Sequence, residues 1–204
     1  MIRVGIIGTI GSGKSFISKL FKRPVFSADR EVIYLYKNNK KCFRKLKSKM
    51  PEFVNKFPIK KKQLIKAISA NKNNLNKIAS VVHPLVRDKM RVFLKKNQNE
   101  DMVILDIPLL IENKLNKKKD ILIYVKSDKK KIIRRLKKRP NFNEKVLRRL
   151  KENQSLISKK KRLADYIVDN NDSIKVMKKK IRFIKNKILH ERNNTWHRNY
   201  WIIC

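Results

Sequence analysis

Acidic side chains are scarce in this chain of 204 residues, which has 16 Asp and Glu against 55 Lys and Arg and a formal net charge of +39. Such a charge is typical of polyanion-binding proteins, because clustered cations release counterions from nucleic acid. It is also typical of compositional drift in chains rich in lysine, asparagine and isoleucine. The lysines form short, scattered runs without a basic tail or the interleaved aromatic residues that stack bases. We favour drift, and specific nucleic-acid binding stays as an alternative.

Cysteines and long apolar runs are also scarce. The two cysteines, Cys42 and Cys204, are far apart and have no metal-ligand spacing, so we expect no disulfide framework and a cytoplasmic location. The longest apolar stretch, 102–111, contains Asp106 and Pro108 and is too short to span a bilayer. A glycine-rich motif occupies the place of a signal-peptide core, so we expect neither a signal peptide nor a membrane partner. The 41% of hydrophobic residues is enough for the core of one domain, which we expect to be a monomer.

The motif near the N-terminus is a complete P-loop, G-x-x-x-x-G-K-[ST]. An apolar run, 4–7, precedes it and an amphipathic stretch, 16–21, follows it, so it lies between a predicted strand and a predicted helix. A simple glycine-rich turn is the alternative, but all fixed positions are present in the required context. Backbone amides of such a loop point at phosphate, the lysine reaches the β- and γ-phosphates, and the final hydroxyl lies on Mg²⁺. The motif consists of Gly8, Thr9, Ile10, Gly11, Ser12, Gly13, Lys14 and Ser15.

Carboxylates follow two of the predicted strands. A short strand begins at 25–26 and ends in Ser27-Ala28-Asp29, and Asp106 ends the strand 102–106. A carboxylate at the carboxyl end of a strand beside a P-loop strand faces the ligand crevice, so Asp29 is a candidate base or Mg²⁺ organiser; helix N-capping is the alternative. Asp106 has the Walker-B-like position that holds Mg²⁺. Glu112 orients substrate or caps a helix. The remaining strands are expected at 2–7, 120–125 and 164–170.

The segment 31–99 reads as mostly helical, and a second basic segment, 127–161, reads as one or two helices. Within the first, His83 precedes Pro84, so we expect a helix to start there with Arg87 in its first turn. Arg87 is either a phosphate clamp or a solvated cap residue. The basic segment resembles the arginine-bearing lid of P-loop kinases, although for any single arginine there we favour a solvated helix face. A final helix is expected at 173–188, and the aromatic tail 193–204 matches no pattern.

These stretches, in this order, resemble the dephospho-CoA kinase family over nearly the whole chain to about residue 188. The family pattern is found at Gly8 to Ser15, Ser27-Ala28-Asp29, His83-Pro84-x-x-Arg87, Asp106-x-Pro108-Leu109-Leu110-x-Glu112, Arg135-x-x-x-Arg139, Gln154 and Ala164-Asp165-Tyr166-x-x-Asp169-Asn170.

The resemblance implies an α/β fold of the P-loop kinase type, with a parallel sheet of about five strands, a helical substrate-binding insertion and a lid. It implies transfer of the γ-phosphoryl group of ATP, with Mg²⁺, to the ribose 3′-hydroxyl of dephospho-CoA, giving CoA and ADP. We expect one domain at 1–190, with a core (1–30, 100–126, 162–190), an acceptor-binding region (31–99), a lid (127–161) and a tail (191–204). Another small-molecule or nucleoside-monophosphate kinase is the runner-up.

Residue roles follow by position in the family pattern. Asp29 is implied as the base on the 3′-hydroxyl, Lys14 as a phosphate ligand, Ser15 as the Mg²⁺ ligand and Arg139 as the lid arginine. Residues 8–16 and Asn170 are implied to bind ATP, with Asn170 in the adenine pocket. The acceptor side is implied to comprise Asp29, His83, Arg87, Asp106 and Glu112.

The chain departs from the family pattern in several places. Ser27 replaces the first acid of Asp-Ala-Asp, which removes a negative charge near the metal, and Phe16 replaces a hydroxyl residue after the P-loop. The lid is unusually basic, and the aromatic tail lies outside the pattern. None of these departures changes Lys14, Ser15 or Asp29.

Overall fold

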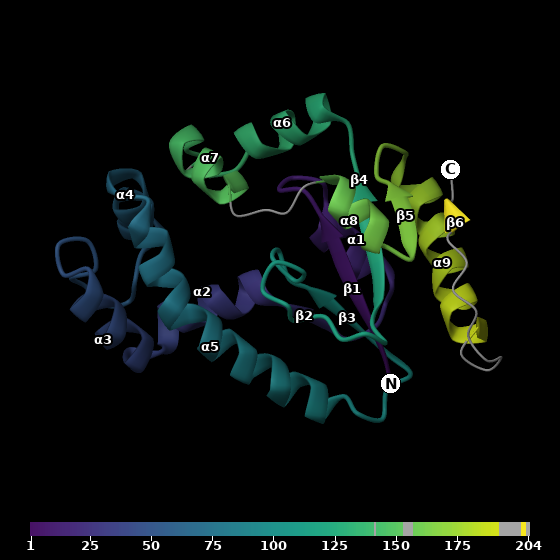
Figure 1. The fold of residues 1–204 in the computed structure, drawn as a ribbon, viewed down its shortest axis with the longest axis horizontal. Coiled ribbons are helices and arrows are strands. Elements are labelled where there is room, and N and C mark those ends of the chain that lie inside the picture. The colour runs from purple at the N-terminus through teal and green to yellow at the C-terminus, as the bar shows by residue number, and fades with distance from the viewer. Residues whose placement is uncertain (141, 153–156, 192–200, 203–204) are drawn as a thin grey trace. The chain divides into compact units, whose positions relative to one another are not determined.

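The computed structural model describes residues 1–140, 142–152, 157–191 and 201–202 (Figure 1). The chain divides into two compact units. The first, which we call the sheet unit, comprises Met1–Ser27, Asn97–Lys138 and Gln154–Cys204. The second, the helical unit, comprises Ala28–Lys96 and Arg139–Asn153.

The sheet unit is built on a parallel sheet. Its strand order is β2-β3-β1-β4-β5-β6, and every neighbouring pair runs parallel. The five strands expected from the sequence are confirmed, and the aromatic tail contributes a sixth, short strand at the edge beside β5. Trp196, Tyr200 and Cys204 of the tail lie outside the described residues. The strands are β1 (Ile2–Gly8), β2 (Val25–Ser27), β3 (Met102–Asp106), β4 (Ile121–Lys126), β5 (Tyr166–Asp169) and β6 (Trp201–Ile202).

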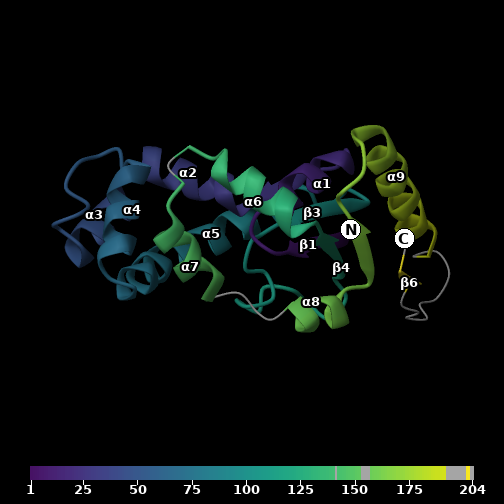
Figure 2. The same ribbon diagram turned by 90° about the horizontal axis from the view of Figure 1, so that it is seen from above.

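Helices cover both faces of this sheet. Helices α1 (Lys14–Leu20) and α9 (Ile174–Glu191) lie on one face and α8 (Ile157–Leu163) on the other, as Figure 2 shows. The buried side chains of α9 are Met177, Ile181, Ile184 and Ile188, a spacing of three and four residues that places them on one stripe. Strands covered on both faces are buried throughout, which explains why β3 is apolar at each position before Asp106.

The helical unit confirms the prediction that residues 31–99 are mostly helical. Apolar side chains at helical spacing form its interior, among them Leu35, Leu46, Leu64, Val82 and Met90. Its helices are α2 (Ala28–Asn38), α3 (Lys40–Lys49), α4 (Lys61–Ala70), α5 (Asn73–Lys96) and α7 (Glu144–Glu152).

The expected helix start at Pro84 is wrong, because α5 continues through it. Proline removes one backbone hydrogen bond and costs about 3 kcal/mol inside a helix. Burial on both sides of Pro84 offsets this cost, since Val81, Val82 and Val86 all lie on the buried face of α5. His83 and Arg87 therefore lie in the middle of a long helix and not at its first turn.

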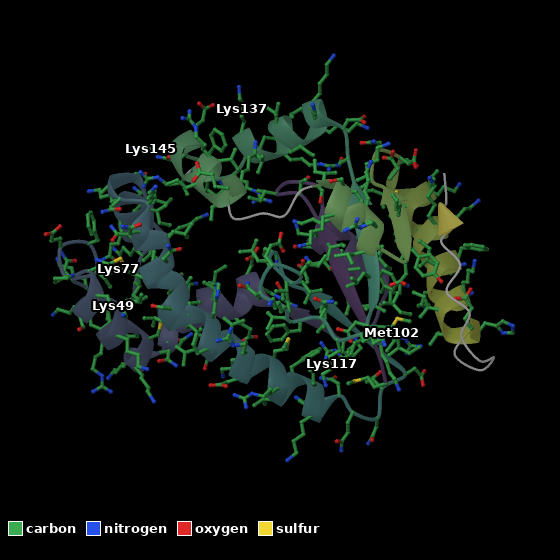
Figure 3. All side chains as sticks on the ribbon, in the orientation of Figure 1. Lys49, Lys77, Met102, Lys117, Lys137 and Lys145 are labelled. Carbon is green, nitrogen blue, oxygen red and sulfur yellow. The ribbon has the colours of Figure 1, made fainter. Side chains whose placement is uncertain are left out.

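The surplus positive charge lies at the surface. Lysines such as Lys49, Lys77, Lys137 and Lys145, labelled in Figure 3, are exposed, whereas Met102 is buried. Among the described residues, the buried cationic side chains are Lys14 and Lys160, which are 9% and 1% exposed. Across the described part of the chain, none of the helices is long and apolar enough to cross a membrane.

Candidate active site

The P-loop lies between β1 and α1, at the edge where the carboxyl ends of the strands meet. Gly13 is the residue before α1, with φ 96° and ψ 22°, and Gly11 has φ 86°. Both values fall in the left-handed region that glycine adopts without strain. A turn from Ser12 N–H to the Thr9 carbonyl, 3.2 Å, closes the loop. A loop of this shape presents successive backbone amides to an anion.

Lys14 is buried against the loop that precedes it. Its Nζ donates hydrogen bonds to the carbonyls of Gly8, at 3.2 Å, and Thr9, at 2.9 Å. These bonds satisfy a charged group that is costly to bury without partners. Ser15 follows in the first turn of α1 and is exposed, so its hydroxyl is accessible to a ligand.

Two side chains from distant parts of the sheet unit hold the P-loop in this shape. Asn170, in the turn after β5, donates from Nδ2 to the Ser12 carbonyl at 2.8 Å. Arg135, on α6 (Lys129–Lys137), donates from Nη1 to the same carbonyl at 3.3 Å and to Ser127 Oγ at 2.9 Å. Its Nη2 donates to the Asn170 carbonyl at 3.2 Å. The sequence pattern contained Arg135 without assigning it a role, and the structure gives it this one.

These supports leave no room for side chains at two glycine positions of the loop. A Cβ on Gly13 would lie 2.1 Å from Asn170 Nδ2. A Cβ on Gly11 would lie 3.0 Å from both Ile132 Cγ2 and Leu136 Cγ of α6. The requirement for glycine is thus steric as well as conformational at these two positions.

Asn170→Ala tests whether the P-loop depends on this support. The substitution leaves the buried Ser12 carbonyl with one donor fewer, so we expect the Kd for ATP to rise about tenfold. Isothermal titration with a non-hydrolysable ATP analogue measures the change, with the exposed Asn186→Ala on α9 as a control. An unchanged Kd in Asn170→Ala would contradict a supporting role.

On the other side of β1, two polar side chains lie together at the ends of adjacent strands. Ser27 of β2 and Asp106 of β3 are paired in register and are 9% and 4% exposed. The Asp106 carboxylate therefore lies beside the position where the family pattern has an acid and this chain has serine. The prediction that strand β2 extends to Asp29 is wrong, because β2 ends at Ser27 and Asp29 lies two residues later, exposed in the first turn of α2. Because α2 begins at Ala28, the alternative that Asp29 caps a helix starting at Arg30 is wrong.

Glu112 lies in the turns 108–114 that follow β3. Its Oε1 is 2.8 Å from Nζ of Lys160 on α8, in a pair whose side chains are 13% and 2% exposed. Residues 113–120 contain no helix, so the helix-capping alternative for Glu112 is wrong. Sequence reasoning did not identify Lys160, which is one cation among 55.

The helical unit contains the other residues singled out from the sequence. His83 and Arg87 lie one turn apart on α5, with His83 half-buried and Arg87 exposed. Burial, reinforced by the charge of Arg87, lowers the pKa of His83, so its imidazole is neutral at pH 7. Arg139 is exposed and lies two residues after α6 ends at Lys137. The Gln154 position lies outside the described residues.

The side-chain oxygens near the P-loop are suitable ligands for a magnesium ion that is bound together with a nucleotide. Among the residues that the structure describes, no three His, Cys, Asp or Glu side chains are grouped so as to hold a metal. Mg²⁺ typically takes one or two protein oxygens and completes its octahedron with phosphate and water. The Ser15 hydroxyl and the Asp106 carboxylate are hard oxygen ligands of the required kind.

Comparison with known proteins agrees with this geometry. A family model described as dephospho-CoA kinase matches residues 2–176. Dephospho-CoA kinase of Zymomonas mobilis is 31% identical over 187 residues, covering 90% of this chain and 95% of its own length. That of Rhizobium meliloti is 33% identical over 189 residues, covering 90% and 96%.

Solved structures are similar over the same length. TT1252 from Thermus thermophilus superposes with a TM-score of 0.70 and 26% identity, covering 92% of this chain and 97% of its own. Dephospho-CoA kinase from Campylobacter jejuni superposes with a TM-score of 0.62 and 19% identity, covering 93% and 98%, which supports the fold. The α/β P-loop fold, the family model and the relatives agree, and the chain belongs to the dephospho-CoA kinase family of ATP-dependent kinases.

Proposed function

We propose that this kinase uses Asp29 as the base that accepts the proton of the ribose 3′-hydroxyl of dephospho-CoA, while the γ-phosphoryl group of ATP is transferred to that oxygen. The exposed carboxylate of Asp29 lies two residues after the end of β2, a strand whose neighbour β3 ends in Asp106. A carboxylate within hydrogen-bond reach of an acceptor hydroxyl directs the hydroxyl oxygen toward phosphorus.

The P-loop holds the phosphates in this proposal. Its amides bind the β-phosphate, and Lys14 exchanges its two bonds to the Gly8 and Thr9 carbonyls for phosphate oxygens. Residues 8–16 form the nucleotide site, and Asn170, fixed on the Ser12 carbonyl, forms part of the adenine pocket. Arg139 acts from the lid on the transferring phosphoryl group, where a guanidinium stabilises spread negative charge.

The Ser15 hydroxyl and the Asp106 carboxylate would hold Mg²⁺ beside the phosphates. When bound there, the ion neutralises charge on the β- and γ-phosphates. Ser27, in place of an acid, leaves Asp106 as the carboxylate on this strand pair. The acceptor side comprises Asp29, His83, Arg87, Asp106 and Glu112. Of these, the Arg87 guanidinium and the His83 imidazole suit the anionic pyrophosphate of dephospho-CoA. The single-domain division, the monomeric state and the cytoplasmic location remain predictions from the sequence.

The single observation that carries this proposal is the constrained P-loop, with Lys14 buried on its own carbonyls and Asn170 and Arg135 fixed on Ser12. Such a loop is built for a nucleoside triphosphate. Asp106 ends the neighbouring strand β3, and Asp29 follows the end of β2 by two residues.

A mass-spectrometric transfer assay tests the acceptor. The enzyme is incubated with Mg-ATP and dephospho-CoA, and in parallel with AMP, shikimate or RNA in place of dephospho-CoA. We expect a product heavier by one phosphoryl group with dephospho-CoA alone, and mapping by fragmentation should place it on the ribose 3′-oxygen. Transfer to AMP or shikimate in place of dephospho-CoA would contradict the proposed acceptor. RNA binding that persists at high salt would support the polyanion alternative.

A further inference from the structure

The ion pair between Lys160 and Glu112 is deeply buried, as is the pair between Arg3 and Asp120. Lys160 is 1% exposed, and among the described residues the other buried cation is Lys14 of the P-loop. A lysine in a chain with 55 cationic residues is normally at the surface, since burying its ammonium costs several kcal/mol. A buried ion pair adds little net stability over apolar packing, so stability alone is a weak reason for its presence.

The pair joins two segments that lie on the same face of the sheet. Helix α8, which carries Lys160, packs on β1 and β4. The loop that carries Glu112 lies over β1 as well, because Leu110 fills the space beside Gly5, where a Cβ would lie 2.4 Å from its Cδ2. Leu110 is fully buried, and the turns around it are closed by bonds from Asn113 N–H to Leu109 and from Leu115 N–H to Leu110. The loop is therefore fixed at Leu110 by packing and at Glu112 by charge.

This loop begins at the acceptor side of the sheet. It leaves β3 directly after Asp106, whose register partner is Ser27, and the chain reaches Asp29 two residues after Ser27. The nucleotide-side supports are Asn170, in the turn after β5, and Arg135, on the helix α6 that follows β4. Strands β4 and β5 lie on the opposite side of β1 from β3. A displacement of the Glu112 loop is thus expected to weaken binding of the acceptor more than binding of ATP.

We propose that Lys160 is a positioning residue of the acceptor site, acting through Glu112. Its ammonium fixes one oxygen of the Glu112 carboxylate at 2.8 Å and so orients the group toward the acceptor. The inference rests on the acceptor role proposed above for Glu112. It assigns to α8, which begins within the expected lid segment 127–161 and packs on β1 and β4, a part in acceptor binding that the family pattern did not indicate.

Steady-state kinetics of Lys160→Met, Glu112→Gln and the double variant test this inference. We expect Lys160→Met to raise the KM for dephospho-CoA about tenfold or more and to leave the KM for ATP unchanged, because misplacement is confined to the acceptor side. Lys159→Met, an exposed neighbour on α8, is the matched control. A rise in both KM values, or in neither, would overturn the inference.

The double variant separates positioning from folding. Lys160→Met removes the ammonium that faces a largely buried carboxylate, so the Tm of this variant should fall. The double variant should regain Tm because neither charge remains. The KM for dephospho-CoA should stay raised in the double variant, and its return to the wild-type value would show that the ion pair is purely structural.

Glu112→Gln alone reports on the proposed role of Glu112. If it raises this KM while Lys160→Met does not, Glu112 keeps its role and the inference fails.

Discussion

Asp29→Asn is expected to lower turnover by about 10²-fold to 10⁴-fold, the usual contribution of a general base. The amide keeps the shape of the side chain but does not accept the hydroxyl proton. Asp29 is exposed in the first turn of α2, so the substitution should leave folding intact. We expect the KM for ATP to stay near the wild-type value, since the P-loop and its supports are unchanged. Rapid-quench measurement of the phosphoryl-transfer step checks the loss.

Asp88→Asn is the matched control for this substitution. Asp88 is an exposed carboxylate on α5 of the same helical unit and pairs with Arg91 on the surface. A surface pair contributes little to stability, so this variant should have nearly normal turnover. If Asp29→Asn also turned over normally, Asp29 would not be the base, and the carboxylate of Asp106 would become the candidate.

Lys14→Ala is expected to reduce the transfer rate by about 10²-fold to 10³-fold, because a preorganised cation beside the transferring phosphoryl group is lost. Unlike Asp29→Asn, it should also weaken ATP binding, since the lysine contacts phosphates in the ground state as well as in the transition state. The two variants therefore separate the phosphate site from the acceptor site. Single-turnover rates and analogue binding, measured together, distinguish these effects.

Lys19→Ala on α1 is the control for Lys14→Ala, because Lys19 is an exposed lysine on the same helix. The high positive charge of the chain makes this control necessary. The surface field attracts nucleotides whichever lysine is removed, so a comparable loss in Lys19→Ala would show that charge in general, and not the P-loop lysine, is responsible.

The strands and the P-loop were predictable because short-range patterns determine them. Apolar runs identify strands buried on both faces, and the motif fixes the turn between β1 and α1. The start of a helix at Pro84 was predicted wrongly from equally local reasoning. Tertiary burial of Val81, Val82 and Val86 decides the continuity of α5, and a dipeptide carries no information about it.

The supports of the site were harder to predict, because they depend on residues that are far apart in the sequence. Arg135 and Asn170 reach Ser12 from 123 and 158 positions away. Nothing in its local sequence distinguishes Lys160 from the exposed Lys159 and Lys161, and its burial follows from the packing of α8 on β1 and β4. Sequence patterns therefore identified Asn170 and Arg135 without their bonds to the P-loop, and missed Lys160 altogether.

The contacts of α6 with the P-loop have a thermodynamic consequence. Ile132 and Leu136 pack on Gly11 while Arg135 is bonded to Ser12, so the loop is ordered without any help from a ligand. Fixing the backbone of a flexible residue costs about 1–2 kcal/mol of conformational entropy. Because folding already fixes the backbone of the phosphate loop, ATP binding does not have to supply this entropy. More of the binding free energy of ATP is then used to align the phosphates and to stabilise the transition state.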